Sequence, residues 1–305
     1  ALRASHTMTR LGTPLAGLWG AIGLLIGLPV QAQTFSNALA EARWELNASV
    51  FECRLSYPLP GFGSAHFAQR AGETQAFFLH QENRYLAAGE AQVMAVSPVW
   101  RETQVRETLT PAQVSENDRP VHLNWRRSQS LAAKLHEGMQ LAFENAAWYG
   151  QDKSVRLVLE PVGFRRAFDA YQSCLMSLLP VNFDQVSRTA IYFPPGNREL
   201  PDGELEKLDL VARYTQADEE IVQVYVDGHT DGAGLRDDNL SLSRERAESV
   251  AQFLMDRGVT ENKIVIRWHG ERYPVASNQT PEGRAENRRV TIRLEKIEEL
   301  RASNR

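Results

Sequence analysis

Hydrophobic and polar residues alternate along much of the first half of the chain with the period of a β-strand. Phe51, Cys53, Leu55 and Tyr57 fall on one side of an extended segment, because successive side chains of a strand point to opposite faces. Two prolines and two glycines within residues 58–63 predict a turn after this segment. Similar short runs bounded by turn residues predict further strands over residues 75–79, 92–96 and 155–159.

Two stretches with helical spacing interrupt these strands. Residues 130–137 form the first and residues 165–179 the second, and each is followed by a helix-ending residue, a glycine in one case and a proline in the other. The second helix carries Cys174. We interpret residues 33–180 as a β-rich domain closed by this helix.

After residue 180 the pattern changes to strand, helix, strand, helix, strand, strand. Residues 221–226 form a near-continuous apolar run, which is typical of a buried strand. Residues 243–257 place apolar side chains at helical spacing and precede Gly258, a preferred residue after a helix. We expect an α/β sandwich of order βαβαββ over residues 181–298, a tail over 299–305, and a mixed α+β chain as a whole. The other expected elements are strands over 189–193, 264–268 and 290–294 and a helix over 204–214.

The first 32 residues differ from the rest of the chain. An apolar run from Leu15 to Leu28 is followed by small and polar residues up to Ala32, which predicts a signal peptide over residues 1–32 with cleavage after Ala32. A retained membrane anchor is the alternative, but the run is shorter than the roughly 20 residues that a spanning helix needs. We therefore expect an exported protein with no membrane span in its mature form.

The charge balance argues against a nucleic-acid partner. The chain has 34 basic and 38 acidic residues, a formal net charge of -4, and phosphate backbones are bound through clustered positive charge.

Two cysteines are present, Cys53 and Cys174. An even number in an exported chain predicts one disulfide, with two buried thiols as the alternative. The bridge would close a loop of roughly 120 residues and stabilise the first domain by about 4 to 5 kcal/mol in the chain-entropy model.

The polar residues that follow the buried strand 221–226 are candidates for a binding site. Asp231 lies in the loop directly after this strand, and Arg246 lies in the helix that comes next. Loops at the carboxyl ends of strands are common ligand sites, and an arginine can bind a carboxylate through two parallel hydrogen bonds. The pair predicts a site for a ligand with an ammonium and a carboxylate on one carbon. A salt bridge without a ligand is the alternative.

Other chemistry finds less support in the same stretch. Asp227, His229 and Asp231 alternate as metal ligands can, but Gly228 interrupts the geometry and no second cluster of His or Cys lies near. We expect no metal and no cofactor. With both cysteines expected to be oxidised and no H-E-x-x-H or G-x-S-x-G element present, we also expect no enzymatic activity.

The second half of the chain resembles the OmpA-like peptidoglycan-binding domain over residues 190–295. Six motifs follow in order: Gly228-His-Thr-Asp-Gly-Ala-Gly, Asn239, Leu242-Ser-x-x-Arg-Ala, Gly258-Val, Gly270-Glu-x-x-Pro and Gly283-Arg-Ala-Glu-Asn-Arg-Arg-Val. The resemblance implies binding of the diaminopimelate side chain of peptidoglycan, its ammonium by Asp231 and its carboxylate by Arg246. Asn239, Thr230 and Arg289 would support the pocket. From the residues alone, the Arg288–Arg289 pair could equally be a solvated face at a strand start.

The first half is similar to the N-terminal domain of the MotY family of flagellar T-ring proteins. The similarity lies in Trp44-Glu-Leu, Glu52-Cys-Arg-Leu, Pro58-Leu-Pro-Gly-Phe-Gly and Pro98-Val-Trp, and in the helix with Cys174. It implies a periplasmic protein that attaches to the flagellar basal body with a MotX-like partner and holds the stator against the wall. A general envelope protein that uses the same wall anchor without a flagellar role is the alternative.

Aromatic residues of the first domain have two possible roles. We expect most of them in the core, with an exposed subset available as a docking surface. The residues concerned are Trp44, Phe62, Trp100, Trp125 and Trp148.

Overall fold

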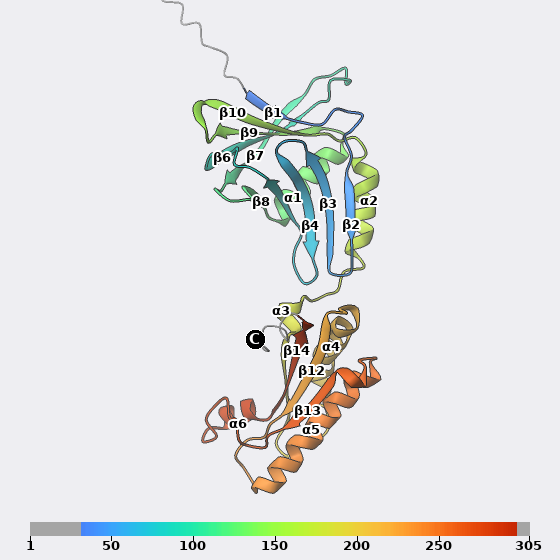
Figure 1. The fold of residues 1–305 in the computed structure, drawn as a ribbon, viewed down its shortest axis with the longest axis vertical. Helices are drawn as coiled ribbons and strands as arrows, with labels where there is room; N and C mark the ends of the chain where they lie inside the picture. Colours follow the sequence, from blue (N-terminus) through green and yellow to red (C-terminus); the bar gives the residue numbers. More distant parts are fainter. Residues whose placement is uncertain (1–31, 298–305) are drawn as a thin grey trace, which may run out of the picture.

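A computed structural model describes residues 32–297 of the chain and has two sheets, each with its own hydrophobic core (Figure 1). The predicted signal peptide up to residue 31 and the predicted tail lie outside the described residues. None of the helices within residues 32–297 is long and apolar enough to cross a membrane.

The first sheet has ten strands in the order β1-β10-β9-β6-β7-β8-β5-β4-β3-β2. All neighbouring strands are antiparallel except β1 and β10, which are parallel. Strand β3 alternates between buried and half-buried residues along its whole length, as predicted. The strands are β1 (Ala32–Phe35), β2 (Glu45–Ala48), β3 (Glu52–Leu59), β4 (Gly63–Arg70), β5 (Ala76–Gln81), β6 (Gly89–Val96), β7 (Arg106–Val114), β8 (Val121–Leu123), β9 (Gln140–Ala147) and β10 (Gly150–Leu159).

Helices α1 (Trp125–His136) and α2 (Phe164–Leu175) pack on this sheet and close its core. Aromatic rings dominate the contact: the ring of Trp44 lies 4.9 Å from those of Tyr57 and Phe164, measured between centroids. Large buried rings contribute hydrophobic area and specific edge-to-face packing. Cys53 of β3 and Cys174 of α2 form a disulfide, so the predicted bridge is confirmed and ties this helix to the sheet.

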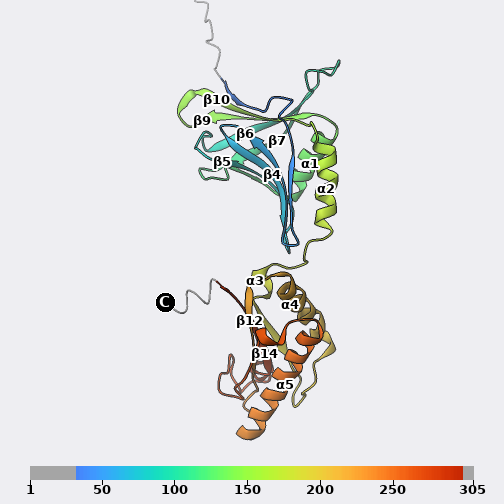
Figure 2. The same ribbon diagram turned by 45° about the vertical axis from the view of Figure 1, so that its right-hand side comes forward.

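The second sheet has the order β11-β14-β12-β13. Strands β12 and β13 are parallel, while β14 is antiparallel to both β11 and β12. Helices α4 and α5 pack against it, and Figures 1 and 2 show both on the same side of the strands. The expected βαβαββ order is confirmed, with a short α6 added before the last strand. The elements are α3 (Phe183–Val186), β11 (Arg188–Tyr192), α4 (Leu205–Ala217), β12 (Ile221–Gly228), α5 (Arg236–Asp256), β13 (Ile264–Trp268), α6 (Pro281–Asn287) and β14 (Arg289–Lys296).

Two helices start earlier than the sequence pattern predicts. Helix α1 begins at Trp125 instead of residue 130, because the side chain of Asn124 accepts a hydrogen bond from the amide of Arg127 and caps the helix there. Helix α5 begins at Arg236 instead of residue 243. Its first turn is polar on all sides, so apolar periodicity gives no sign of it.

The two cores meet at a small apolar junction. Phe51, in the turn between β2 and β3, packs against the second core, and its ring lies 5.5 Å from that of Tyr214 in α4. The amide of Leu179, in the segment that links the domains, donates to the carbonyl of Val50 at 2.9 Å. Phe51 lies two residues before Cys53, so the disulfide anchors the part of the chain that carries the junction.

Candidate functional site

The five side chains that the sequence indicates as a site lie at one end of the second sheet. Thr230 and Asp231 follow the carboxyl end of β12, Asn239 and Arg246 belong to α5, and Arg289 is the first residue of β14. All five are buried, with exposed fractions from 0% for Arg246 to 9% for Asp231. The fold therefore brings together residues that are far apart in the sequence.

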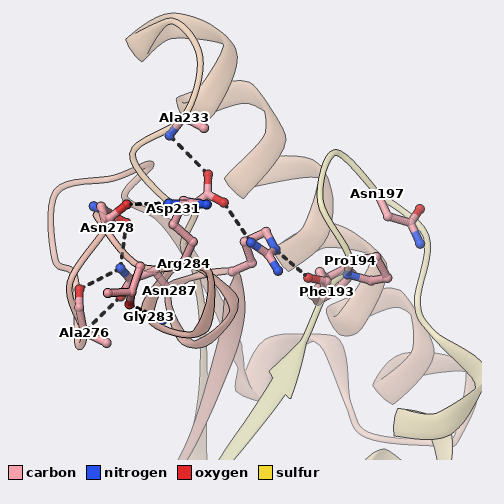
Figure 3. A network of polar contacts seen from close by, with 12 residues as sticks. Phe193, Pro194, Asn197, Asp231, Ala233, Ala276, Asn278, Gly283, Arg284 and Asn287 are labelled. Atoms are coloured by element: carbon pink, nitrogen blue, oxygen red, sulfur yellow. Dashed lines mark hydrogen bonds and ion pairs between the residues drawn. The ribbon is translucent and has the colours of Figure 1, made fainter.

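The carboxylate of Asp231 is held by one cation and one amide. It accepts a hydrogen bond from Nη1 of Arg288 at 2.9 Å and another from the amide of Ala233 at 3.2 Å (Figure 3). Arg288 also donates from Nε to the carbonyl of Phe193 at 3.0 Å, which connects Asp231 to the segment after β11. The side chains of the ion pair are 13% and 12% exposed, so solvent screens them little.

Arg246 is a fully buried cation whose hydrogen-bond partners are all carbonyls. Its Nε donates to the carbonyl of Asn197 at 2.7 Å, and its Nη2 to that of Pro194 at 3.1 Å. Nη1 lies 3.5 Å from the carbonyl of His229. Within residues 32–297 no carboxylate forms a salt bridge with Arg246, although buried charges are usually paired. Burial, helped by the positive charge of Arg288, lowers the pKa of Arg246 to about 10.

The three supporting residues line the same region. Asn239 donates from Nδ2 to the carboxylate of Glu271 at 2.5 Å, and Arg289 donates from Nη2 to the carbonyl of Tyr273 at 3.3 Å. Oγ1 of Thr230 and Nη1 of Arg289 are buried without a hydrogen-bond partner in the described part of the chain. Buried polar atoms without a partner are rare in folded proteins. Because these two have none in the described residues, they are available to a bound polar group.

Two features of the motifs shape the site. A Cβ on Gly228 would lie 2.0 Å from the carbonyl oxygen of Ser243, so only glycine lets α5 approach β12 this closely. Asn287, which is fully buried, accepts hydrogen bonds from the amides of Val275 and Ala276 and donates to the side chain of Asn278 at 2.7 Å (Figure 3). It thereby fixes the loop beside Asp231.

Arg288 is the functional candidate that the sequence interpretation missed. The alternative of a solvated face for Arg288 and Arg289 is wrong, because Arg288 pairs with Asp231 and Arg289 is 8% exposed. The sequence feature that could have indicated this role is the pair of arginines at the start of a strand. Neighbouring side chains of a strand point in different directions, so Arg288 can reach Asp231 while Arg289 lies against Tyr273.

Asp227, one of the possible metal ligands near the site, is occupied by other contacts. Asp227 accepts two hydrogen bonds of 2.7 Å from Arg267 and lies 2.8 Å from Nε2 of His269. Among residues 32–297 no group of three or more His, Cys, Asp or Glu side chains is placed to hold a metal ion.

The electrostatic pattern of the site is complementary to a zwitterion. Asp231 offers a negative charge whose internal partner is a guanidinium, and Arg246 offers a positive charge whose internal partners are neutral carbonyls. In a ligand with an ammonium and a carboxylate on one carbon, the ammonium could replace Arg288 at Asp231 and the carboxylate could replace the carbonyls at Arg246. The segment of Phe193, Pro194 and Asn197 supplies the carbonyls (Figure 3), so it would have to move for the carboxylate to enter.

Comparison with known proteins finds a match for each half of the chain. Residues 35–180 match the family model of the MotY N-terminal domain, and residues 192–288 match that of the OmpA family. The sodium-type flagellar protein MotY of Vibrio parahaemolyticus is 26% identical over 257 residues, which cover 83% of this chain and 87% of that one.

Other relatives match a smaller share of the chain. The probable lipoprotein YiaD of Escherichia coli is 48% identical over 71 residues, 23% of this chain and 32% of its own. The peptidoglycan-binding protein ArfA of Mycobacterium tuberculosis is 47% identical over 70 residues, 23% of this chain and 22% of its own. The C-terminal domain of Helicobacter pylori MotB has a solved structure that covers 38% of this chain and 92% of its own, with a TM-score of 0.35 and 24% identity.

Proposed function

We propose that this protein is a flagellar motor component of the periplasm that anchors the basal body to peptidoglycan. The proposal is supported by the match of the first half to the MotY N-terminal domain and of the second half to the OmpA family. The first domain attaches to the basal body as part of the T-ring, with a MotX-like protein as partner, and the second holds the ring and the stator against the wall. The protein acts by binding and not by catalysis.

The ligand of the second domain is the diaminopimelate residue of the peptidoglycan stem. The observation that carries this proposal is Arg246, a buried cation with carbonyls but no carboxylate as partners among the described residues, in the same site as Asp231. Arg246 binds the ligand carboxylate bidentately and Asp231 binds its ammonium in place of Arg288. Thr230 and Arg289 supply the unpartnered Oγ1 and Nη1 at the edge of the site, and Asn239 holds the loop of Glu271 in position.

Co-sedimentation with purified sacculi tests this assignment. We expect the mature protein to sediment with sacculi that contain diaminopimelate and not with sacculi that carry lysine at that position, because lysine has no second carboxylate. The variant Asp231→Asn should lose binding, since an amide cannot replace the charge. Arg244→Ala is the control, because Arg244 lies on α5 like Arg246 but is 57% exposed and pairs with Glu248.

Equal sedimentation with both kinds of sacculi would refute the assignment of diaminopimelate as the ligand. Deletion of the gene tests the rest of the proposal: cells with intact filaments that do not swim support the motor role. A leaky envelope with normal swimming would instead indicate a general wall anchor.

A further inference from the structure

A groove at the end of the first domain combines exposed apolar side chains with unpaired arginines. Its volume is about 410 Å³, and it lies between the β6–β7 loop, the end of α1 and the start of α2. We call it the Trp100 groove. Its lining includes Trp100, Arg101, Leu135, Glu137, Arg165 and Arg166, and the carboxylate of Glu137 is paired with Lys134 at 3.2 Å.

The apolar part of the groove is unusually exposed. Trp44 and Phe62 are buried in the core as expected, but Trp100 is 52% exposed and its neighbour Val99 is 82% exposed. Leu135 forms a fully buried floor beneath them. Large apolar groups exposed around a concavity mark interaction sites, and tryptophan and arginine are the residues most enriched among strong interface contacts.

Among the described residues no carboxylate forms a salt bridge with the arginines of the groove. Arg101, Arg165 and Arg166 form no salt bridge within residues 32–297. Two of them instead donate to the carboxyl end of α1: Arg165 to the carbonyl of His136 at 2.7 Å, and Arg101 to that of Glu137. These contacts fix the guanidinium groups at the rim and leave other donors free, because each guanidinium has five N–H groups.

We propose that the Trp100 groove binds a segment of a partner protein that carries a large apolar side chain flanked by carboxylates. The apolar side chain enters between Trp100 and the floor at Leu135, and the carboxylates pair with the arginines of the rim. Complementary charge of this kind directs association and excludes partners of the wrong charge. The groove lies at the end of the first domain away from the second, since α2 starts there and runs toward the linker (Figure 1). A partner can therefore occupy it while the second domain holds the wall.

This inference rests on the proposed function in one respect, that the partner belongs to the basal body. The test uses the full mature protein and basal bodies isolated from cells of the source organism that lack it. We expect Trp100→Ala with Arg165→Glu to reduce retention on the basal bodies by roughly tenfold or more, as for a central interface contact. Binding to sacculi should not change. Arg84→Glu with Trp148→Ala is the control, because Trp148 is 51% exposed and Arg84 stacks on it but already pairs with Glu116.

A photoreactive residue at position 100 identifies the occupant. Cross-linking to an acidic segment of a basal-body protein supports the proposal. Cross-linking to a second copy of this chain, or equal retention of the groove variant and the wild type, overturns it and leaves the flagellar role intact. If the wild-type protein itself fails to sediment with basal bodies, the flagellar role and this partner fall together.

Discussion

The two domains differ in their largest fully buried side chains, which are mostly aromatic rings in the first domain and Arg246 in the second. The first core is built from aromatic rings around Trp44, Phe67 and Phe164 and is closed by a disulfide. The second core is smaller, and beside it lie the buried charges of Asp231 and Arg246. Burial of apolar rings stabilises a fold, whereas burial of a charge without a full partner costs free energy. The difference predicts that the first domain is the more stable one and that the second gives up stability for the proposed binding site.

Removal of the disulfide should have the largest effect on stability, and only in the first domain. The bridge spans 121 residues, so the double variant Cys53→Ser/Cys174→Ser should lower the free energy of unfolding by about 4 to 5 kcal/mol. Urea unfolding followed by the fluorescence of the first domain measures the change. Dithiothreitol added to the wild type should have the same effect, and binding to sacculi should persist. An unchanged unfolding midpoint would refute the stabilising role of the bridge.

Acid should weaken both domains, each through one buried histidine. Burial lowers the pKa of His66 to about 4, with help from the charge of Arg54, and burial lowers the pKa of His229 to about 4, with help from Arg289. The folded state keeps both rings neutral, so below pH 6.5 the unfolded chain takes up protons that the folded chain does not. Stability is therefore complete above pH 6.5 and declines toward pH 4, by roughly 3 kcal/mol for each histidine.

Single replacements separate the two contributions. Both ring nitrogens of His66 have hydroxyl partners, Ser56 at 2.8 Å and Ser64 at 2.7 Å, while Nδ1 of His229 has no partner in the described residues. Unfolding at pH 7.5 and pH 5 should show that His229→Gln loses acid sensitivity in the second domain only, and His66→Gln in the first only. If both variants keep the full pH dependence, other groups cause it.

The sequence predicts the second domain better than the first for a physical reason. Strand β12 is an apolar run between two helices with clear periodicity, so the sequence pattern predicts the helices before and after it as well as the strands that pair with it. Strand β9 was missed because Leu141, Ala142 and Phe143 are all buried, and a strand covered on both faces shows no alternation. Strand β4 was missed because it has four buried residues in succession.

The sequence predicts where the candidate residues lie but not the contacts they make. The motifs around Asp231 and Arg246 indicate where the loop and the helix meet. They do not indicate that Asp231 pairs with Arg288, or that the carbonyls of Pro194 and Asn197 surround Arg246. These contacts join residues that lie 49 to 57 positions apart in the sequence, so they depend on the register of the sheet and on how α5 packs against it.

Loss of the junction should have a smaller effect and should act on both domains together. Phe51 belongs to the first domain but packs against the second core, so Phe51→Ala should lower stability by about 1 to 2 kcal/mol, less than for a fully buried phenylalanine. Small-angle scattering should show a broader range of distances between the domains. Val50→Ala is the control, because Val50 is 39% exposed and its contact with Leu179 uses only the backbone. Identical scattering of wild type and Phe51→Ala would mean that the linker alone fixes the domains.

The smallest change in stability should accompany a complete loss of binding, at Arg246. Replacement by Met removes three carbonyl contacts but also removes a buried cation that no carboxylate in the described residues neutralises. Because the cost of burying a charge without a carboxylate partner offsets the three hydrogen bonds to carbonyls, Arg246→Met should change the free energy of unfolding by less than about 1 kcal/mol. Sedimentation with diaminopimelate sacculi should fall to background. If Arg246→Met destabilises the protein as much as the disulfide variant does, Arg246 is a structural residue. The proposed contrast between a stable first domain and a second domain that gives up stability for binding would then be wrong.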